Sequence, residues 1–125
     1  MQPFIDSTVI IAAFTPNEKK EACQKIINEG GVINGLVLIE SFDVIERITK
    51  NREYSLKVVR SLMSSSLEIA QLTNAFIFEA IKRSNRNSLR IFDMIHYSTA
   101  LLYNCSGIIS YDKHFDNLDI KRVEP

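Results

Sequence analysis

Short apolar runs alternate along the chain with longer segments in which apolar residues recur at helical spacing. A short apolar run bounded by turn residues is typical of a buried strand. These runs predict strands over residues 4–5, 32–33, 67–70 and 107–110, and a last edge strand over residues 120–123. The alternation indicates strands that are separated by helices.

The longer segments predict helices, because their apolar positions form one face at a period of 3.6 residues. Pro16, the Gly30-Gly31 pair and Gly107 mark helix ends. The expected helices cover residues 9–14, 18–29, 36–52 and 54–63, a helix capped by Thr73 or Asn74 that ends at about residue 83, and a last helix from residue 89 or 90 to 104. In the longest of them, the inner face is expected to carry Leu36, Ile39, Val44, Ile45 and Ile48.

Apolar strands that alternate with helices are typical of a parallel sheet covered on both faces. The predicted fold class is therefore α/β, with a three-layer α/β/α arrangement around a short-stranded central parallel sheet. In such sheets, ligands bind beyond the carboxyl ends of the strands. Functional residues are therefore expected at that edge.

Composition and charge narrow the class of protein. The chain has 125 residues, of which 46% are hydrophobic, so residues 1–125 are expected to form a single domain with a sizeable core. Fifteen basic and fifteen acidic residues give a formal net charge of zero. A nucleic acid would therefore have to be bound by a local basic patch, because no overall positive field attracts it.

The cysteines and the amino-terminal segment bear on the cellular compartment. Cys23 and Cys105 have no His or Cys neighbour at metal-ligand spacing, so both are interpreted as buried small apolar side chains. The first residues carry no basic segment, and no apolar run approaches membrane-spanning length. We therefore expect a cytoplasmic protein with no signal peptide and no membrane association.

Four acidic residues are expected to converge at the carboxyl edge of the sheet. Asp6 directly follows the first strand, and Asp112 lies just beyond the strand at residues 107–110. Asp93 lies near the first turn of the helix that precedes that strand, and Glu40 lies about one turn into the helix after residues 32–33. A helix that runs antiparallel to the strands begins at the same edge, so all four carboxyl groups can meet there.

Carboxylates that converge repel one another unless a cation lies between them. Hard oxygen ligands of this kind suit Mg²⁺ or Mn²⁺, and such an ion can activate water and polarise a phosphodiester without any protein nucleophile. Each acid taken singly is more often a helix cap or an exposed charge. The combination of four acids at one edge favours a metal site for phosphoryl chemistry.

The motifs around these acids resemble those of the PIN domain family. The opening motif, a strand followed by Asp, small hydroxyl residues and an apolar helix, is Phe4-Ile5-Asp6-Ser7-Thr8-Val9-Ile10 here. The second motif is Val37-Leu38-Ile39-Glu40, the third is Asp93-Met94-Ile95-His96-Tyr97-Ser98-Thr99-Ala100, and the closing motif is Ile109-Ser110-Tyr111-Asp112-Lys113-His114-Phe115. The resemblance covers essentially the whole chain and extends to the small VapC-type toxin ribonucleases of that family.

The resemblance implies a site and an activity. It implies that Mg²⁺ or Mn²⁺ is held by four catalytic acids: Asp6, Glu40, Asp93 and Asp112. Thr8 and Ser110 would support the site by orienting water or a carboxylate. The implied activity is metal-dependent hydrolysis of RNA phosphodiester bonds by an endoribonuclease, the toxin of a toxin-antitoxin pair. An antitoxin protein would be its partner, and a homodimer its assembly.

Basic residues near the third acid are candidates for binding RNA phosphates. They are Arg86 and Arg90, which precede Asp93, with Lys113 of the closing motif as a weaker candidate. An ordinary solvated helix end and loop is an equally good interpretation of the first two. His96 shares a helix face with Asp93, but polar packing beside the site is the preferred interpretation, because metal-activated water makes a histidine base unnecessary.

Two other functions fit parts of the pattern. A non-catalytic PIN-like RNA-binding or scaffold module would bind RNA tightly without cutting it. A receiver-like signalling domain shares the broad architecture, but it needs a phosphorylatable Asp after the third strand, where Leu67-Glu68-Ile69-Ala70-Gln71 offers none. The nuclease is therefore the leading hypothesis, and the binding module is its alternative.

Overall fold

The computed structural model describes residues 1–84 and 89–125 of the chain. Its sheet has five parallel strands in the order β3-β2-β1-β4-β5. The strands are β1 (Phe4–Ile5), β2 (Val32–Asn34), β3 (Glu68–Ala70), β4 (Ile108–Ile109) and β5 (Arg122–Val123). Each of the five short apolar runs therefore forms a strand, and the expectation of a parallel sheet is confirmed.

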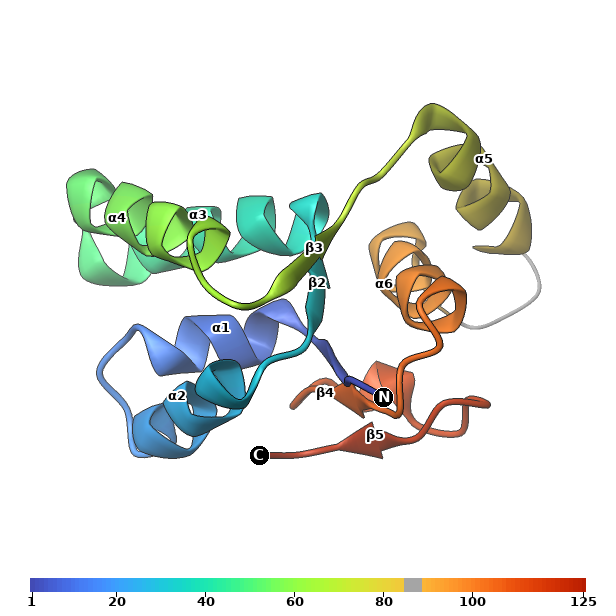
Figure 1. The fold of residues 1–125 in the computed structure, drawn as a ribbon. Coiled ribbons are helices and arrows are strands. Elements are labelled where there is room, and N and C mark those ends of the chain that lie inside the picture. The colour runs from blue at the N-terminus through green and yellow to red at the C-terminus, as the bar shows by residue number, and fades with distance from the viewer. Residues whose placement is uncertain (85–88) are drawn as a thin grey trace.

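Helices cover both faces of this sheet. They are α1 (Ser7–Ala13), α2 (Lys20–Glu29), α3 (Gly35–Thr49), α4 (Arg52–Met63), α5 (Asn74–Arg83) and α6 (Ile91–Leu102), with a short 3₁₀ helix, η2 (Lys113–Phe115). Figure 1 shows α1 to α4 on one side of the strands and α5 and α6 on the other. The structure therefore has the predicted α/β class and the three-layer arrangement.

The prediction of one helix over residues 36–52 is wrong at the carboxyl end of that helix. α3 stops at Thr49, because Lys50 adopts a left-handed backbone conformation with a φ of 54°. Asn51 then caps α4, and its side chain accepts a hydrogen bond of 3.0 Å from the backbone N–H of Tyr54. The turn uses lysine and asparagine instead of glycine, so the sequence carries no strong stop signal there.

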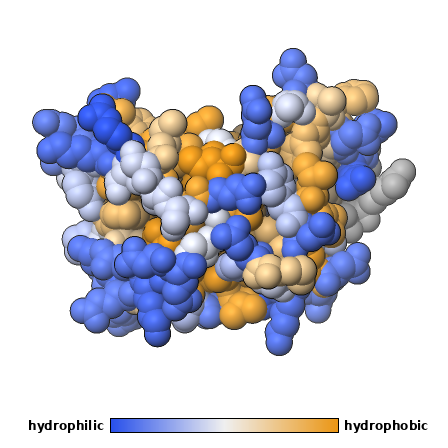
Figure 2. Space-filling view, in the orientation of Figure 1, coloured by the Kyte–Doolittle hydropathy of each residue, from blue (hydrophilic) through white to orange (hydrophobic). Residues whose placement is uncertain are grey.

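The buried face of α3 also differs from the expected one. Val37, Ser41 and Ile45 are buried, whereas Ile39 and Ile48 are 66% and 53% exposed. The apolar pattern identified Ile45 on this face but missed Val37 and Ser41, because a serine in the middle of the face interrupts the apolar spacing. The exposed Ile39 instead helps to line an apolar groove of about 700 Å³ next to α6. Figure 2 shows apolar side chains gathered over the middle of one face of the molecule.

The core holds the strands and the closing segment in place. Phe4, Ile33 and Ile108 are fully buried in the sheet, and Phe115 of η2 is fully buried as well. Burial of a side chain of this size stabilises a fold by roughly 1.5–3 kcal/mol. The segment that follows β4 is therefore anchored to the core at Phe115, which fixes the backbone on which Asp112 lies.

Two smaller expectations concern the cysteines and membrane-spanning segments. Cys23 and Cys105 are free and buried, which confirms their interpretation as packed apolar side chains. Among the helices of the described residues, none combines the length and the apolar character needed to cross a membrane.

Candidate active site

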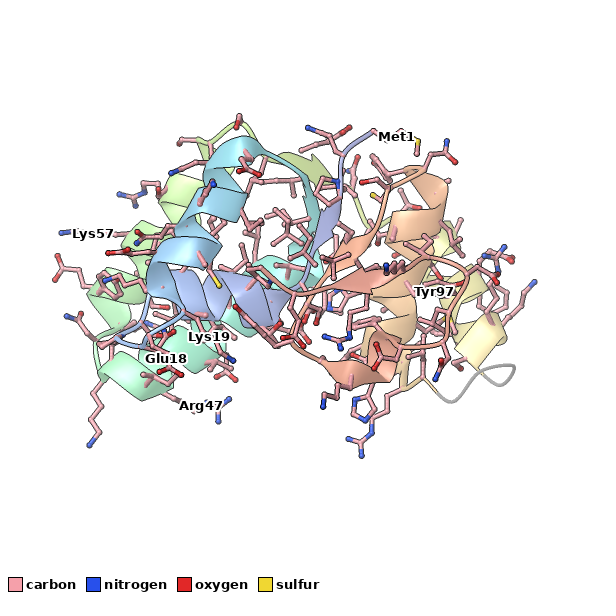
Figure 3. The ribbon with its side chains drawn as sticks, turned by 90° about the horizontal axis from the view of Figure 1, so that it is seen from below. Met1, Glu18, Lys19, Arg47, Lys57 and Tyr97 are labelled. Carbon is pink, nitrogen blue, oxygen red and sulfur yellow. The ribbon has the colours of Figure 1, made fainter. Side chains whose placement is uncertain are left out.

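The parallel register brings side chains from three neighbouring strands to the same edge of the sheet. Asp6 and Ser110 each directly follow a register pair of β1 and β4, so they leave the sheet side by side. Asn34 ends β2 at the same level on the other side of Asp6. Met1, which precedes the start of β1, lies at the opposite end of the strands (Figure 3). The edge that gathers these side chains is therefore the carboxyl edge.

Asp6 lies at the centre of this edge and is only 4% exposed. Its Oδ2 atom accepts hydrogen bonds of 2.7 Å from the Ser110 hydroxyl and 2.9 Å from the Thr8 hydroxyl. The backbone N–H of Thr8 donates a longer bond of 3.4 Å to the same oxygen, which caps α1. Within the described part of the chain, every hydrogen bond to this side chain ends on Oδ2. The Oδ1 atom is therefore the one available to a ligand.

The two hydroxyl groups also fix the closing segment. The Ser110 hydroxyl accepts a hydrogen bond of 2.9 Å from the backbone N–H of Asp112. The Thr8 hydroxyl accepts one of 3.1 Å from the backbone N–H of Tyr111. Each hydroxyl thus donates to Asp6 and accepts from the segment that carries Asp112. Thr8 and Ser110 therefore contact the first acid directly and hold the last one through its backbone.

Glu40 reaches the same edge from α3. Its Oε1 atom lies 2.8 Å from Nε2 of His96, a residue of α6 that is only 1% exposed. One possible ligand atom from each of Asp6, Glu40 and His96 lies within 4.8 Å of the other two. The Glu40 carboxyl group is therefore close to Asp6, as the sequence predicts, and it has a histidine partner that the sequence does not predict.

A second group forms at the start of α6. Asp93 lies in the first turn of that helix, and Asp112 caps η2 by accepting a hydrogen bond of 2.9 Å from the backbone N–H of His114. The His114 Nδ1 atom lies 2.8 Å from Asp112 Oδ1 and 4.0 Å from Asp93 Oδ2. Ligand atoms of all three residues lie within 4.8 Å of one another.

Electrostatics connect the two groups. Burial raises the pKa of Asp93 above its ordinary value, and the negative charges of Asp112 and Asp6 raise it further. A carboxyl group surrounded by other carboxylates ionises with difficulty, and a nearby cation reverses this effect. A crowded set of carboxylate oxygens is also the donor set that Mg²⁺ and Mn²⁺ prefer. The residues at this edge therefore fit a hard divalent cation.

The basic candidates lie at the margin of the site. Arg90 is the residue just before α6, so it lies three positions from Asp93, and its side chain is exposed. Lys113 is exposed on η2, next to Asp112. Arg86 lies outside the described residues. Exposed cations at these two positions border the acidic groups without neutralising them directly.

Sequence reasoning missed Asn34 at this edge. The Asn34 side chain caps α3, lies 3.2 Å from the Nδ1 atom of His96 and donates a bond of 3.0 Å to the Thr99 hydroxyl. A polar residue between an apolar strand and a helix start signals a cap. The sequence does not show that this cap also contacts His96, which lies 62 positions further along the chain.

Comparisons with known proteins agree with this architecture. The sequence model of the PIN domain family matches residues 4–121, and no curated protein matches the sequence. VapC20 of Mycobacterium tuberculosis, described as a toxin that cleaves the sarcin-ricin loop, has a similar structure with a TM-score of 0.80 and 13% identity, over 98% of each chain.

Two further solved structures are similar over nearly their whole length. A toxin-antitoxin complex from Klebsiella pneumoniae aligns with a TM-score of 0.76 and 14% identity, over 98% of this chain and 97% of the other. VapBC2 from Rickettsia felis, bound to a DNA fragment from its promoter, aligns with a TM-score of 0.70 and 15% identity, over 99% and 98%. At these identities the similarity shows a shared fold. On the family match over residues 4–121, the chain belongs to the PIN domain family.

Proposed function

We propose that this chain is a metal-dependent endoribonuclease that hydrolyses RNA phosphodiester bonds. The observation that carries the proposal is the pair of acidic groups at the carboxyl edge of the sheet, Asp6 with Glu40 and Asp93 with Asp112. The negative charge of Asp6 acts on Asp93, so the two groups are close enough to interact. Membership of the PIN domain family and the structural similarity to a toxin described as cleaving the sarcin-ricin loop support it.

The four carboxylates would hold Mg²⁺ or Mn²⁺. When bound, such an ion supplies positive charge to a phosphodiester and lowers the pKa of water. The protein itself orients the carboxylate oxygens that would bind the ion. Ser110 and Thr8 hold Oδ2 of Asp6, so that Oδ1 would be left for the ion. The backbone N–H of Asp112 donates to the Ser110 hydroxyl, which keeps this acid beside Asp93.

RNA would be held by basic residues at the margin of the acidic groups. Arg90 and Lys113 are exposed next to Asp93 and Asp112, and Arg86 belongs to the same basic stretch of sequence. Contacts from such side chains to phosphate oxygens give affinity and position without reading the base sequence. The recognised RNA must therefore be selected by other parts of the surface or by the shape of the RNA.

We further propose that the protein is the toxin of a toxin-antitoxin pair, acts in the cytoplasm and forms a homodimer. One of the similar structures is a toxin-antitoxin complex, and another is VapBC2 on promoter DNA. Expression of the chain alone is expected to arrest growth, and co-expression of its antitoxin is expected to restore it. Growth arrest that persists with Asp6→Asn would contradict this proposal.

RNA cleavage by the purified protein tests the nuclease directly. A panel of structured and single-stranded RNAs is incubated with EDTA, Mg²⁺ or Mn²⁺, with the wild type, Asp6→Asn and Asp43→Asn. Asp43 is an exposed acid of α3 whose one ion pair among the described residues is with Arg47, so it controls for loss of one negative charge. Metal-dependent products are expected from the wild type and from Asp43→Asn, and not from Asp6→Asn.

The same assay separates the nuclease from its alternative, a non-catalytic PIN-like RNA-binding or scaffold module. That module would bind RNA tightly and give no products at any Mg²⁺ or Mn²⁺ concentration. Tight binding without cleavage would therefore replace the nuclease assignment by the binding module.

A further inference from the structure

His96 lies between Asn34 and Glu40, and it joins two elements of the site. Its Nδ1 atom is 3.2 Å from the side-chain nitrogen of Asn34, and its Nε2 atom is 2.8 Å from Oε1 of Glu40. The ring is 1% exposed, so it is shielded from bulk water and depends on these two partners. The protonation of the two ring nitrogens therefore decides what His96 does for Glu40.

The orientation of the Asn34 amide is fixed by its other partners. Its oxygen accepts a hydrogen bond of 2.9 Å from the backbone N–H of Val37, as the cap of α3. Its nitrogen donates one proton to the Thr99 hydroxyl at 3.0 Å. That hydroxyl donates in turn to the carbonyl of Ile95 at 2.8 Å, so its oxygen is the acceptor towards Asn34. The remaining amide proton points at His96.

An amide NH₂ group only donates, so the Nδ1 atom of His96 must accept. The proton of the neutral ring is then on Nε2, where it is donated to Glu40. Ligation of a metal through Nε2 would need a lone pair there and a proton on Nδ1. That proton would face the NH₂ group of Asn34, so two donors would point at each other with no acceptor between them. Asn34 therefore opposes metal binding by His96, although its ring lies within 4.8 Å of Asp6 and Glu40.

We propose that His96 is a positioning residue that holds the carboxylate of Glu40 through its Nε2–H, and that Asn34 fixes the ring in this state. Within the described residues, Oε1 is the only Glu40 oxygen with a hydrogen bond, so Oε2 is left for the cation. This inference rests on the proposed function, because the cation is what the positioned carboxylate would bind. Partners of metal-binding carboxylates typically change metal affinity by about 10- to 100-fold.

Asn34 also ties this hydrogen bond to the fold. It ends β2, caps the helix on which Glu40 lies, and contacts His96 on α6. Asn34 therefore positions both Glu40, through the cap of its helix, and His96, through the side-chain contact. A change at Asn34 is expected to disturb Glu40 through the ring as well as through the cap.

Mn²⁺ affinity in three proteins tests the positioning role. Calorimetric titrations compare the wild type with His96→Leu, which removes the donor, and His96→Gln, whose side-chain NH₂ reaches the place of Nε2. The dissociation constant for Mn²⁺ is expected to rise roughly tenfold or more in His96→Leu. His96→Gln is expected to restore it to within a few fold of the wild type. Unfolding temperatures without metal identify any variant that has lost its fold.

The tautomer itself is measured by ¹⁵N NMR on the metal-free wild type, which needs no variant and no activity. We expect a neutral His96 ring with its proton on Nε2. Asn34→Ser and Asn51→Ser form a matched pair, because Asn51 caps α4 in the same way. Only Asn34→Ser is expected to alter the ring signals and weaken Mn²⁺ binding.

The outcomes separate this inference from the nuclease proposal. A proton on Nδ1 in the wild type, or Mn²⁺ binding as tight in His96→Leu as in the wild type, would overturn the positioning role even if RNA is cleaved. Equal losses in His96→Leu and His96→Gln would also overturn it. If the wild type binds no Mn²⁺ and cuts no RNA, the proposed function fails and the role of His96 in metal binding fails with it, while the ¹⁵N spectrum still decides the hydrogen bond.

Discussion

The Ser110 hydroxyl donates a hydrogen bond of 2.7 Å to Oδ2 of Asp6, although 104 positions separate the two residues. The parallel register of β1 and β4 makes this contact possible, because both residues directly follow paired strand positions. The same hydroxyl accepts the backbone N–H of Asp112. Ser110 thus connects the first and the last acid of the candidate site.

Replacing Ser110 is therefore expected to harm both stability and metal binding. Ser110→Ala leaves the Asp112 N–H without its partner, which costs about 1–3 kcal/mol of unfolding free energy. It also removes one of the two hydroxyl groups that hold Asp6, so Mn²⁺ affinity should fall roughly tenfold. The control is Ser65→Ala, whose hydroxyl donates to a backbone carbonyl and accepts a backbone N–H far from the site. Equal Mn²⁺ affinity of the two variants in calorimetric titrations would contradict the role given to Ser110.

Replacing each of two glycines by alanine is expected to change the stability of the fold in opposite directions. A Cβ on Gly31 would lie 2.9 Å from the carbonyl oxygen of Pro3 and 2.8 Å from Ile5, so Gly31→Ala should destabilise the fold by about 1–3 kcal/mol. A Cβ on Gly35 would meet none of the described residues within 4 Å. Gly35 begins α3, so Gly35→Ala should stabilise by up to roughly 1 kcal/mol. Urea unfolding of both variants checks the signs, and a loss of stability in Gly35→Ala would contradict the structure there.

The raised pKa of Asp93 predicts a pH-dependent stability difference without metal. Burial is the largest cause of the raised pKa, the negative charges of Asp112 and Asp6 raise it further, and His114 only partly opposes them. The folded state then holds the proton more strongly than the unfolded state, so the stability contributed by this group falls as the pH rises through the folded pKa. Asp93→Asn removes that loss.

Urea unfolding in EDTA measures this difference. At pH 7, Asp93→Asn should be more stable than the wild type, and its advantage should shrink as the pH falls toward 3.8, the ordinary pKa of the group. Added Mn²⁺ should stabilise the wild type more than the variant, because the cation binds the ionised carboxylate. A difference that does not change with pH would contradict the electrostatic origin.

The basic residues at the margin of the site are expected to act on RNA binding. Arg90→Ala and Lys113→Ala should each weaken binding of a single-stranded RNA and lower the magnitude of its salt-dependence slope by about 0.7 per lost phosphate contact. Lys57 projects from α4 at the outer edge of the molecule (Figure 3), so Lys57→Ala should bind like the wild type. Salt titrations of binding check this, and an equal effect at Lys57 would indicate a nonspecific charge effect.

Much of this fold follows from local sequence pattern. Apolar runs such as Val32 and Ile33 predict strands, and a strand followed by Asp6 predicts an acid at the carboxyl edge, because these signals lie within a few residues of one another. The end of α3 is not predicted, because no local signal marks it. Lys50 adopts the left-handed conformation there, and lysine is not a residue type that indicates such a turn.

The contacts that orient the acids could not be predicted in this way. His96 and Asn34 lie on different elements, and the polarity of their contact depends on which partners the amide oxygen and nitrogen find in the fold. Likewise, Thr8 and Ser110 carry no local sign that both hydroxyls end on the same oxygen of Asp6. Residue spacing predicts which acids meet, and only the packed structure shows how each carboxylate is held.

The most direct measurement is Mn²⁺ binding by the metal-free protein, compared between the wild type, Asp6→Asn, Glu40→Gln and Glu46→Gln. Glu46 is the matched control, because it lies on the same helix as Glu40 and its side chain is similarly exposed, 29% against 28%. We predict that Asp6→Asn and Glu40→Gln each weaken binding by more than roughly tenfold, while Glu46→Gln binds like the wild type. A wild type that binds no Mn²⁺, or unchanged affinity in Asp6→Asn and Glu40→Gln, would contradict a metal site formed by these carboxylates.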